Sequence, residues 1–234
     1  MERLLSLLPT ATICVDESER DQYAKAIAGT GAKLALHPPL KNIAHIRNWI
    51  LDNIEGDVCM IDDDLSGVNC LVGRKVRRIT ESDAIDRIIR NAWNVARDLE
   101  LAVFCWQRNP NPMYLNTGDP LGLVIPSAGA FGIIGRTVRF DARLERGEDI
   151  DLTMQSLLNE RITLCDRRFY FDFGAVFTGK GGNQGIRTGA TNEACTALLR
   201  KKWGQYLSVD KAKERGSLNM AIRVKRRSDI ASTR

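Results

Sequence analysis

The stretch V-C-M-I-D-D-D-L, residues 58–65, joins an apolar run directly to three consecutive carboxylates. Residues 58–61 have the length and composition of a buried strand, which places Asp62, Asp63 and Asp64 at its carboxyl end. Carboxylates packed this closely repel one another. Either solvent or a bound cation must therefore make the arrangement tolerable.

The residues before this stretch alternate between strand and helix patterns. A-T-I-C-V at 11–15 and residues 33–36 predict two strands, and residues 18–29 between them predict a helix with Ser18 as its N-cap. Four isoleucines at helical spacing predict a second helix just before residue 58: Ile43, Ile46, Ile50 and Ile54. Strand–helix–strand–helix–strand order is typical of a parallel sheet with helices on both faces.

The rest of the chain continues as a mixture of both patterns. We expect helices at 85–99, from 148 onward and at 191–203, and strands at 101–106, 121–125, 129–134, 161–165 and 168–177. No internal repeat and no linker composition is present, so the sequence predicts one α/β domain over 1–234.

Composition narrows the class of protein. The chain has 234 residues, a net charge of +5 and no apolar run long enough to span a bilayer, which predicts a soluble, cytoplasmic protein. The six cysteines form no C-x-x-C pair, so we expect free thiols. The segment 205–234 is rich in cations; this favours either a solvated surface or attraction to a polyanion such as nucleic acid.

Two acidic clusters carry the chemistry. Ligands bind beyond the carboxyl ends of parallel strands, where Asp62–Asp64 would suit Mg²⁺ or Mn²⁺ with open positions for phosphate. The simpler alternative is a solvated acidic turn. A second cluster, R-G-E-D-I-D-L, holds Glu148, Asp149 and Asp151 at a predicted helix start. Acidic residues also stabilise a helix N-terminus without any catalytic role.

Together the two clusters resemble those of glycosyltransferases with the GT-A fold. The resemblance implies a Rossmann-like, mostly parallel central sheet, and it matches Asp62 and Asp64 to the D-x-D motif and Glu148 and Asp149 to the later E-D motif. N-I-A-H-I-R-N-W-I-L looks like the helix whose arginine faces the donor, which implies that role for Arg47. The opening strand implies donor contacts for Val15, Asp16 and Glu17.

The second half of the chain looks like the small phage-type TET-associated glycosyltransferases, on F-T-G-K-G-G-N-Q-G-I-R-T and T-N-E-A-C-T-A-L-L-R-K-K-W-G-Q-Y. That family is thought to add sugars to hydroxymethylated pyrimidines in DNA. In a phage-encoded member the reaction would take place in the host cytoplasm. The amides of the glycine-rich loop at 179–189, together with Lys180 and Arg187, would contact the diphosphate; the alternative is a flexible surface loop.

The resemblance implies a metal-dependent reaction with a nucleotide-sugar donor, most simply a UDP-sugar. Asp62 and Asp64 would hold Mn²⁺ or Mg²⁺, Asp63 would lie near the donor, and Asp149 would be the base of an inverting reaction, with Glu148 and Asp151 beside it. In a retaining reaction Asp149 would only orient the sugar. No histidine follows His45, so the family's late metal-binding histidine is missing; water, Asp172 or Asn183 would take its place.

A DNA acceptor would need cations for its phosphates. The candidates are Lys201, Lys202, Lys225, Arg226 and Arg227. Three other functions fit the same residues less fully: a glycosyltransferase acting on a glycan or protein, a nucleotidyltransferase, and a nucleic-acid-binding protein without activity. The last of these would leave both acidic clusters unexplained.

Overall fold

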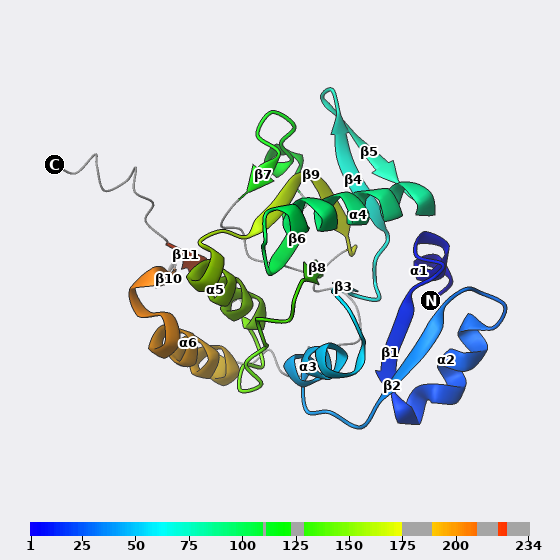
Figure 1. Cartoon of the computed structure of the whole chain (residues 1–234), viewed down its shortest axis with the longest axis horizontal. Helices are drawn as coiled ribbons and strands as arrows, with labels where there is room; N and C mark the ends of the chain where they lie inside the picture. Colours follow the sequence, from blue (N-terminus) through cyan, green and yellow to red (C-terminus); the bar gives the residue numbers. More distant parts are fainter. Residues whose placement is uncertain (110, 123–128, 175–188, 210–219, 224–234) are drawn as a thin grey trace.

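The chain folds into a mixed α/β structure, which we describe from a computed structural model for all residues except 110, 123–128, 175–188, 210–219 and 224–234 (Figure 1). The first quarter contains the predicted strand–helix–strand–helix–strand order, preceded by a short helix, α1, that was not predicted. Its elements are α1 (Glu2–Leu7), β1 (Thr12–Asp16), the 3-10 turn η1 (Glu17–Glu19), α2 (Arg20–Ile27), β2 (Lys33–His37), α3 (Ile43–Asn53) and β3 (Val58–Ile61). Asp16, not Ser18, caps the turn that precedes α2.

The remaining elements follow the alternating pattern of the sequence. They are β4 (Gly67–Val72), β5 (Lys75–Ile79), α4 (Ser82–Asp98), β6 (Val103–Gln107), η2 (Pro112–Tyr114), β7 (Leu121–Gly122), β8 (Ala130–Ile133), α5 (Glu148–Glu160), β9 (Leu164–Asp172), α6 (Gly189–Trp203), η4 (Gly204–Tyr206), β10 (Leu207–Val209) and β11 (Met220–Ile222). The two strands expected over 161–177 are one strand, β9. It continues through a register shift opposite Trp106 and Gln107.

The central sheet has seven strands in the order β3-β8-β6-β9-β4-β5, with β7 beside β9. β6 and β9 are parallel, whereas the other described pairs in this sheet are antiparallel. A mostly parallel sheet is therefore not confirmed. β1 and β2 do run parallel, as predicted, but they form a separate pair. Periodicity reveals strands and not their partners, and here β3 pairs with the later strand β8.

Helices cover both faces of the sheet, as the sequence predicts (Figure 1). On β6, Phe104 and Trp106 pack on one face with residues of α1, β1 and α4. Val103 and Cys105 point to the opposite face, where α3 and α5 contribute Leu51 and Leu152 to a second core. The alternation along this strand follows from its period of two. The sheet is therefore buried on both sides at β6.

A third apolar cluster joins α5, α6 and the β10–β11 pair. Cys195 and Leu199 of α6 are buried in it against Leu157 of α5. None of the six cysteines, all of which lie in the described residues, forms a disulfide. Within the described part of the chain, none of the helices combines the length and apolarity needed to cross a membrane.

Candidate active site

The centre of the candidate site is Arg47, which is buried on α3. Its Nη1 donates to Glu148 Oε1 at 2.9 Å, and its Nη2 lies 3.5 Å from Asp62 Oδ1. The guanidinium carbon also lies 5.0 Å from the centre of the Phe131 ring and 5.4 Å from that of Phe140. Arg47 is thus held by two carboxylates and two aromatic rings, so its position is fixed before any ligand binds.

The helix that carries Arg47 begins at a well-formed cap. The Asn42 side chain accepts from the backbone N–H of His45 at 3.1 Å, which satisfies one of the free amides of the first turn. The same side chain donates to the carbonyl of Ala142 at 3.1 Å. Asn42 therefore ties the start of α3 to the loop that leads into α5, the helix that supplies Glu148.

Asp62 is the first residue after β3 and is half exposed, with 50% of its side chain accessible. Its backbone N–H donates to the carbonyl of Gly129 at 2.8 Å, which continues the β3–β8 pairing by one residue. Desolvation by the surrounding protein raises the pKa of the Asp62 carboxyl, Arg47 opposes this, and the charges of Asp64 and Asp63 raise it further. Burial, followed by the charge of Asp63, also raises the pKa of Asp64.

Gly129 leaves the space that the Asp62 carboxylate occupies. A Cβ at this position would lie 2.7 Å from Asp62 Oδ2 and 2.8 Å from Phe173 Cε2. Contacts this short do not occur without displacing one of the groups. A side chain at 129 would therefore move the carboxylate that faces Arg47.

Glu148 and Asp149 open α5, after Gly147 in a left-handed conformation (φ 77°) that favours glycine. Burial raises the pKa of Glu148, as do the charges of Asp149 and Asp62, while Arg47 opposes the rise. Asp149 Oδ1 accepts from the Ile150 N–H at 2.8 Å, and Oδ2 lies 3.9 Å from Arg108 Nη1. Glu148 of the E-D pair and Asp62 of the strand-end aspartates therefore meet at Arg47, whereas Asp149 lies near Arg108.

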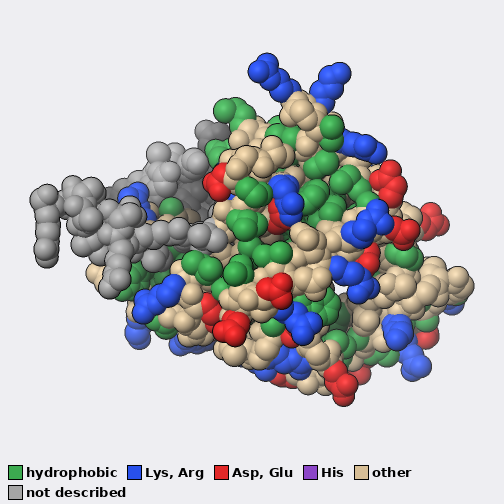
Figure 2. All heavy atoms as spheres, turned by 45° about the horizontal axis from the view of Figure 1, so that its top comes forward, with side chains coloured by type: hydrophobic (Ala, Val, Ile, Leu, Met, Phe, Trp, Pro, Cys, Tyr) green, Lys and Arg blue, Asp and Glu red, His purple; other side chains and the backbone are tan. Residues whose placement is uncertain are grey.

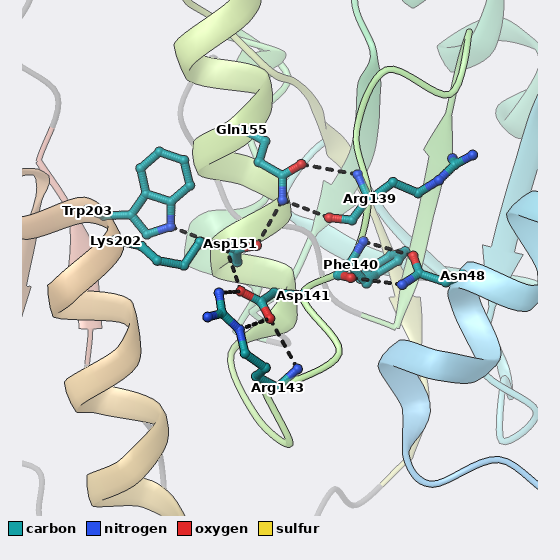
Figure 3. A network of polar contacts seen from close by, with 9 residues as sticks. All are labelled: Asn48, Arg139, Phe140, Asp141, Arg143, Asp151, Gln155, Lys202 and Trp203. Atoms are coloured by element: carbon teal, nitrogen blue, oxygen red, sulfur yellow. Dashed lines mark hydrogen bonds and ion pairs between the residues drawn. The ribbon is translucent and has the colours of Figure 1, made fainter.

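Asp151 belongs to a different network, shown in Figure 3. It is fully buried and contacts Lys202 Nζ at 2.5 Å, and it accepts from Trp203 Nε1 at 2.7 Å and Gln155 Nε2 at 2.8 Å. Lys202 also donates to Asp141 at 2.9 Å. These contacts join α5 to α6, so we assign Asp151 and Lys202 to the fold. Neither a catalytic role nor a phosphate contact is needed to explain them.

The same network holds the segment that carries Phe140 (Figure 3). Asn48 of α3 exchanges hydrogen bonds with the backbone of Phe140 at 2.8 and 3.0 Å. Gln155 of α5 does the same with the backbone of Arg139 at 2.7 and 3.1 Å. The Phe140 ring is thereby kept beside Arg47.

The predicted donor residues on β1 lie at its carboxyl end. Val15 is buried, whereas Glu17 is exposed. Asp16 Oδ1 accepts from the backbone and side chain of Ser18, and these contacts lower the pKa of Asp16. Burial raises the pKa of Tyr23 on α2, as do the charges of Glu19 and Asp63. Asp63 is thus within electrostatic range of α2, which follows β1.

Other predicted residues have partners elsewhere or are not described. Asp172 forms an ion pair with Arg78 at 3.0 Å and accepts from the Gly174 N–H at 2.9 Å. Lys201 is exposed in the last turn of α6. Five predicted site residues and one alternative metal ligand lie outside the described residues: Lys180, Arg187, Lys225, Arg226, Arg227 and Asn183.

Sequence reasoning missed Arg108, although the signal was present. Arg108 directly follows the buried strand β6, just as Asp62 follows β3. Phe131, Phe140 and Gly129 gave no comparable signal. Nothing in the sequence around the two phenylalanines indicates that they lie beside the Arg47 guanidinium, and nothing around Gly129 indicates that it lies beside the Asp62 carboxylate.

The carboxylates have the donor chemistry of a hard divalent cation. Asp62 and Asp64 supply oxygen ligands, which Mg²⁺ and Mn²⁺ prefer, and their mutual repulsion would be offset by such an ion. In the described ranges, no group of three or more His, Cys, Asp or Glu side chains is arranged to hold a metal. A cation bound here would therefore rely on two carboxylates, with other positions filled by solvent or by substrate oxygens.

Comparisons with protein-family models, with curated proteins and with solved structures give no match to this chain.

Proposed function

We propose that this protein is a metal-dependent glycosyltransferase of the GT-A type that moves a sugar from a nucleotide-sugar, most simply a UDP-sugar, to a hydroxymethylated pyrimidine in DNA. One observation carries the proposal. Arg47 and Glu148, 101 positions apart in the sequence, are hydrogen-bonded, and Asp62 lies on the same guanidinium. One residue from each of the three motifs that suggested the activity therefore takes part in this contact, although the E-D motif lies far from the other two in the sequence.

A GT-A arrangement of residues 1–234 is part of the proposal. β1, α2 and β2 form a parallel strand–helix–strand unit. Such a unit suits a nucleotide beyond the carboxyl end of its first strand, near Val15, Asp16 and Glu17.

Different residues of the chain have different roles in the proposed reaction. Arg47 fixes Asp62 and Glu148, and leaves half of the Asp62 side chain accessible to a ligand. A divalent cation on Asp62 and Asp64 would supply Lewis-acid stabilisation of the leaving diphosphate. The acceptor oxygen bonds to the anomeric carbon as the bond from that carbon to the diphosphate breaks. The acceptor's proton passes to Asp149 Oδ2, since Oδ1 already accepts from the Ile150 amide.

A donor and acceptor screen tests the function. The protein is incubated with Mn²⁺, a set of nucleotide-sugars, and duplex DNA that contains 5-hydroxymethylated cytosine or uracil, and the DNA is weighed by mass spectrometry. We expect a gain of one sugar, abolished by EDTA and by Asp64→Ala. A mass gain on a glycan or peptide but never on DNA would contradict the acceptor. Release of pyrophosphate from a nucleoside triphosphate would indicate a nucleotidyltransferase instead.

A further inference from the structure

The hairpin β4–β5 carries an unusual concentration of positive charge. Residues 67–79 contain four cations, Arg74, Lys75, Arg77 and Arg78, and no acidic residue. The strands pair over five positions, from Val68 opposite Ile79 to Val72 opposite Lys75, around a turn that includes Gly73. β5 is the last strand in the order of the central sheet. The cations therefore line an edge ribbon.

Three of these cations are exposed and available. Arg74, Lys75 and Arg77 have no ion-pair partner among the residues that the structure describes, and the nearby side chains of Val72 and Val76 are 58% and 46% exposed. Lys and Arg side chains extend from the top of the molecule in Figure 2, the end at which Figure 1 places the β4–β5 turn. An alternative explanation is that charged residues protect an edge strand from pairing with other chains. That protection would work with either sign of charge, so it does not explain why all the charges here are positive.

The fourth cation fixes the ribbon to the candidate site. Arg78 forms an ion pair with Asp172 at 3.0 Å and donates to the carbonyl of Ser66 at 2.6 Å. Arg3 also donates to that carbonyl, at 2.7 Å. Ser66 lies two residues after Asp64. The base of the ribbon is therefore anchored beside the strand-end aspartates.

We propose that the β4–β5 ribbon binds the phosphate backbone of nucleic acid, through Arg74, Lys75 and Arg77. This proposal rests on the proposed function, because that function identifies the bound nucleic acid as the acceptor DNA. A six-residue strand is about 20 Å long, which corresponds to about six phosphates along one DNA strand. Because the base of the ribbon is anchored beside the strand-end aspartates, a duplex that follows the ribbon would reach them at one end. A two-stranded ribbon also has the width of a major groove, in which a 5-hydroxymethyl group is exposed.

Binding of unmodified duplex DNA tests the ribbon without requiring transfer. Fluorescence anisotropy is measured at several salt concentrations for the whole chain, for Arg74→Gln/Lys75→Gln/Arg77→Gln, and for a matched triple, Lys25→Gln/Lys33→Gln/Arg97→Gln. The matched residues are exposed and lie on α2, β2 and α4. Both triples remove three positive charges. Each phosphate contact contributes about −0.9 to the slope of log K against log salt, so the ribbon triple should make that negative slope shallower by about 2 to 3. It should weaken binding at least tenfold at low salt, whereas the matched triple should do neither.

The two proposals fail separately. Equal binding by the two triples, or no DNA binding by the whole chain, overturns the ribbon, even if transfer to hydroxymethylated DNA is observed. Ribbon-dependent binding without transfer from any nucleotide-sugar overturns the glycosyltransferase and leaves the ribbon standing. The single variant Lys75→Glu controls for the possibility that the triple substitution unfolds the edge strand. Its circular dichroism spectrum should match that of the wild type. This variant should weaken binding more than Lys33→Glu, and equal effects of these two reversals would also overturn the proposal.

Discussion

Arg47 and Glu148 form a buried ion pair at 2.9 Å, between the middle of α3 and the first residue of α5. Their side chains are 9% and 14% exposed. Neither residue reaches bulk water easily, so each depends on the other for charge compensation. The pair therefore stabilises the fold as well as the candidate site, and its removal should change both stability and ligand binding.

The first prediction concerns Arg47→Met. This substitution keeps the apolar stem beneath Phe131 and Phe140 but leaves Glu148 and Asp62 without their cation. Removing one member of a buried pair costs about 3 to 5 kcal/mol, so we expect the free energy of unfolding at pH 7 to fall by about 3 kcal/mol. Urea denaturation measures it. Adding Glu148→Gln should restore part of the lost stability. If the stability losses of the two single variants simply add in the double variant, the pairing is contradicted.

The second prediction is a pH dependence. Glu148 has a pKa raised above its usual 4.5, mainly by burial, so the folded state holds this proton more tightly than the unfolded chain. The resulting stabilisation is complete below pH 4.5 and is lost as pH rises through the raised pKa. Glu148→Gln removes the dependence. The stability of the wild type relative to Glu148→Gln should therefore decrease from pH 4 to pH 7, and a constant difference would be evidence against the raised pKa.

The third prediction tests the space left by Gly129. Gly129→Ala places a Cβ 2.7 Å from Asp62 Oδ2 and 2.8 Å from Phe173 Cε2, so we expect the carboxylate to shift together with, or instead of, the ring. Gly118→Ala is a suitable control, because its Cβ would meet its nearest atom at 3.7 Å. We expect Gly129→Ala to weaken Mn²⁺-dependent nucleotide binding at least tenfold, measured by calorimetry, and Gly118→Ala to leave it unchanged. Equal binding by the two variants would mean that the position of Asp62 does not matter.

Local patterns predicted every described α-helix except α1, and most of the strands, because periodicity depends on neighbouring residues. The positions of Asp62 after β3 and of Glu148 at the start of α5 followed from this alone. Strand pairing did not follow, since β3 pairs with β8, far along the chain, and the sheet became mixed. Local pattern also could not separate Glu148 from Asp151. Both open α5, but one faces Arg47 and the other faces Lys202.

The fourth prediction compares two adjacent lysines. Lys202 contacts Asp151 at 2.5 Å and Asp141 at 2.9 Å, whereas Lys201 is exposed. Lys202→Met leaves Asp151 buried without a cation, so we expect a loss of about 3 kcal/mol in the free energy of unfolding. Lys201→Met should change it by less than about 0.5 kcal/mol. Thermal and urea unfolding of the two variants measure this difference, and similar stabilities would show that the α5–α6 network contributes little.

The last prediction concerns Asp149. Asparagine keeps the shape of the side chain and its hydrogen bond from the Ile150 N–H, but it lacks the basic oxygen. If Asp149 accepts the proton of the acceptor hydroxyl, Asp149→Asn should lower kcat by about 10²-fold or more, while the Kd of the nucleotide-sugar changes little. Arg108→Gln is the matched control, since Arg108 is 3.9 Å from Asp149 Oδ2 and cannot itself remove a proton. It should change kcat less than Asp149→Asn does. Near-normal turnover of Asp149→Asn, with retention of the anomeric configuration in the product, would remove Asp149 from the role of base.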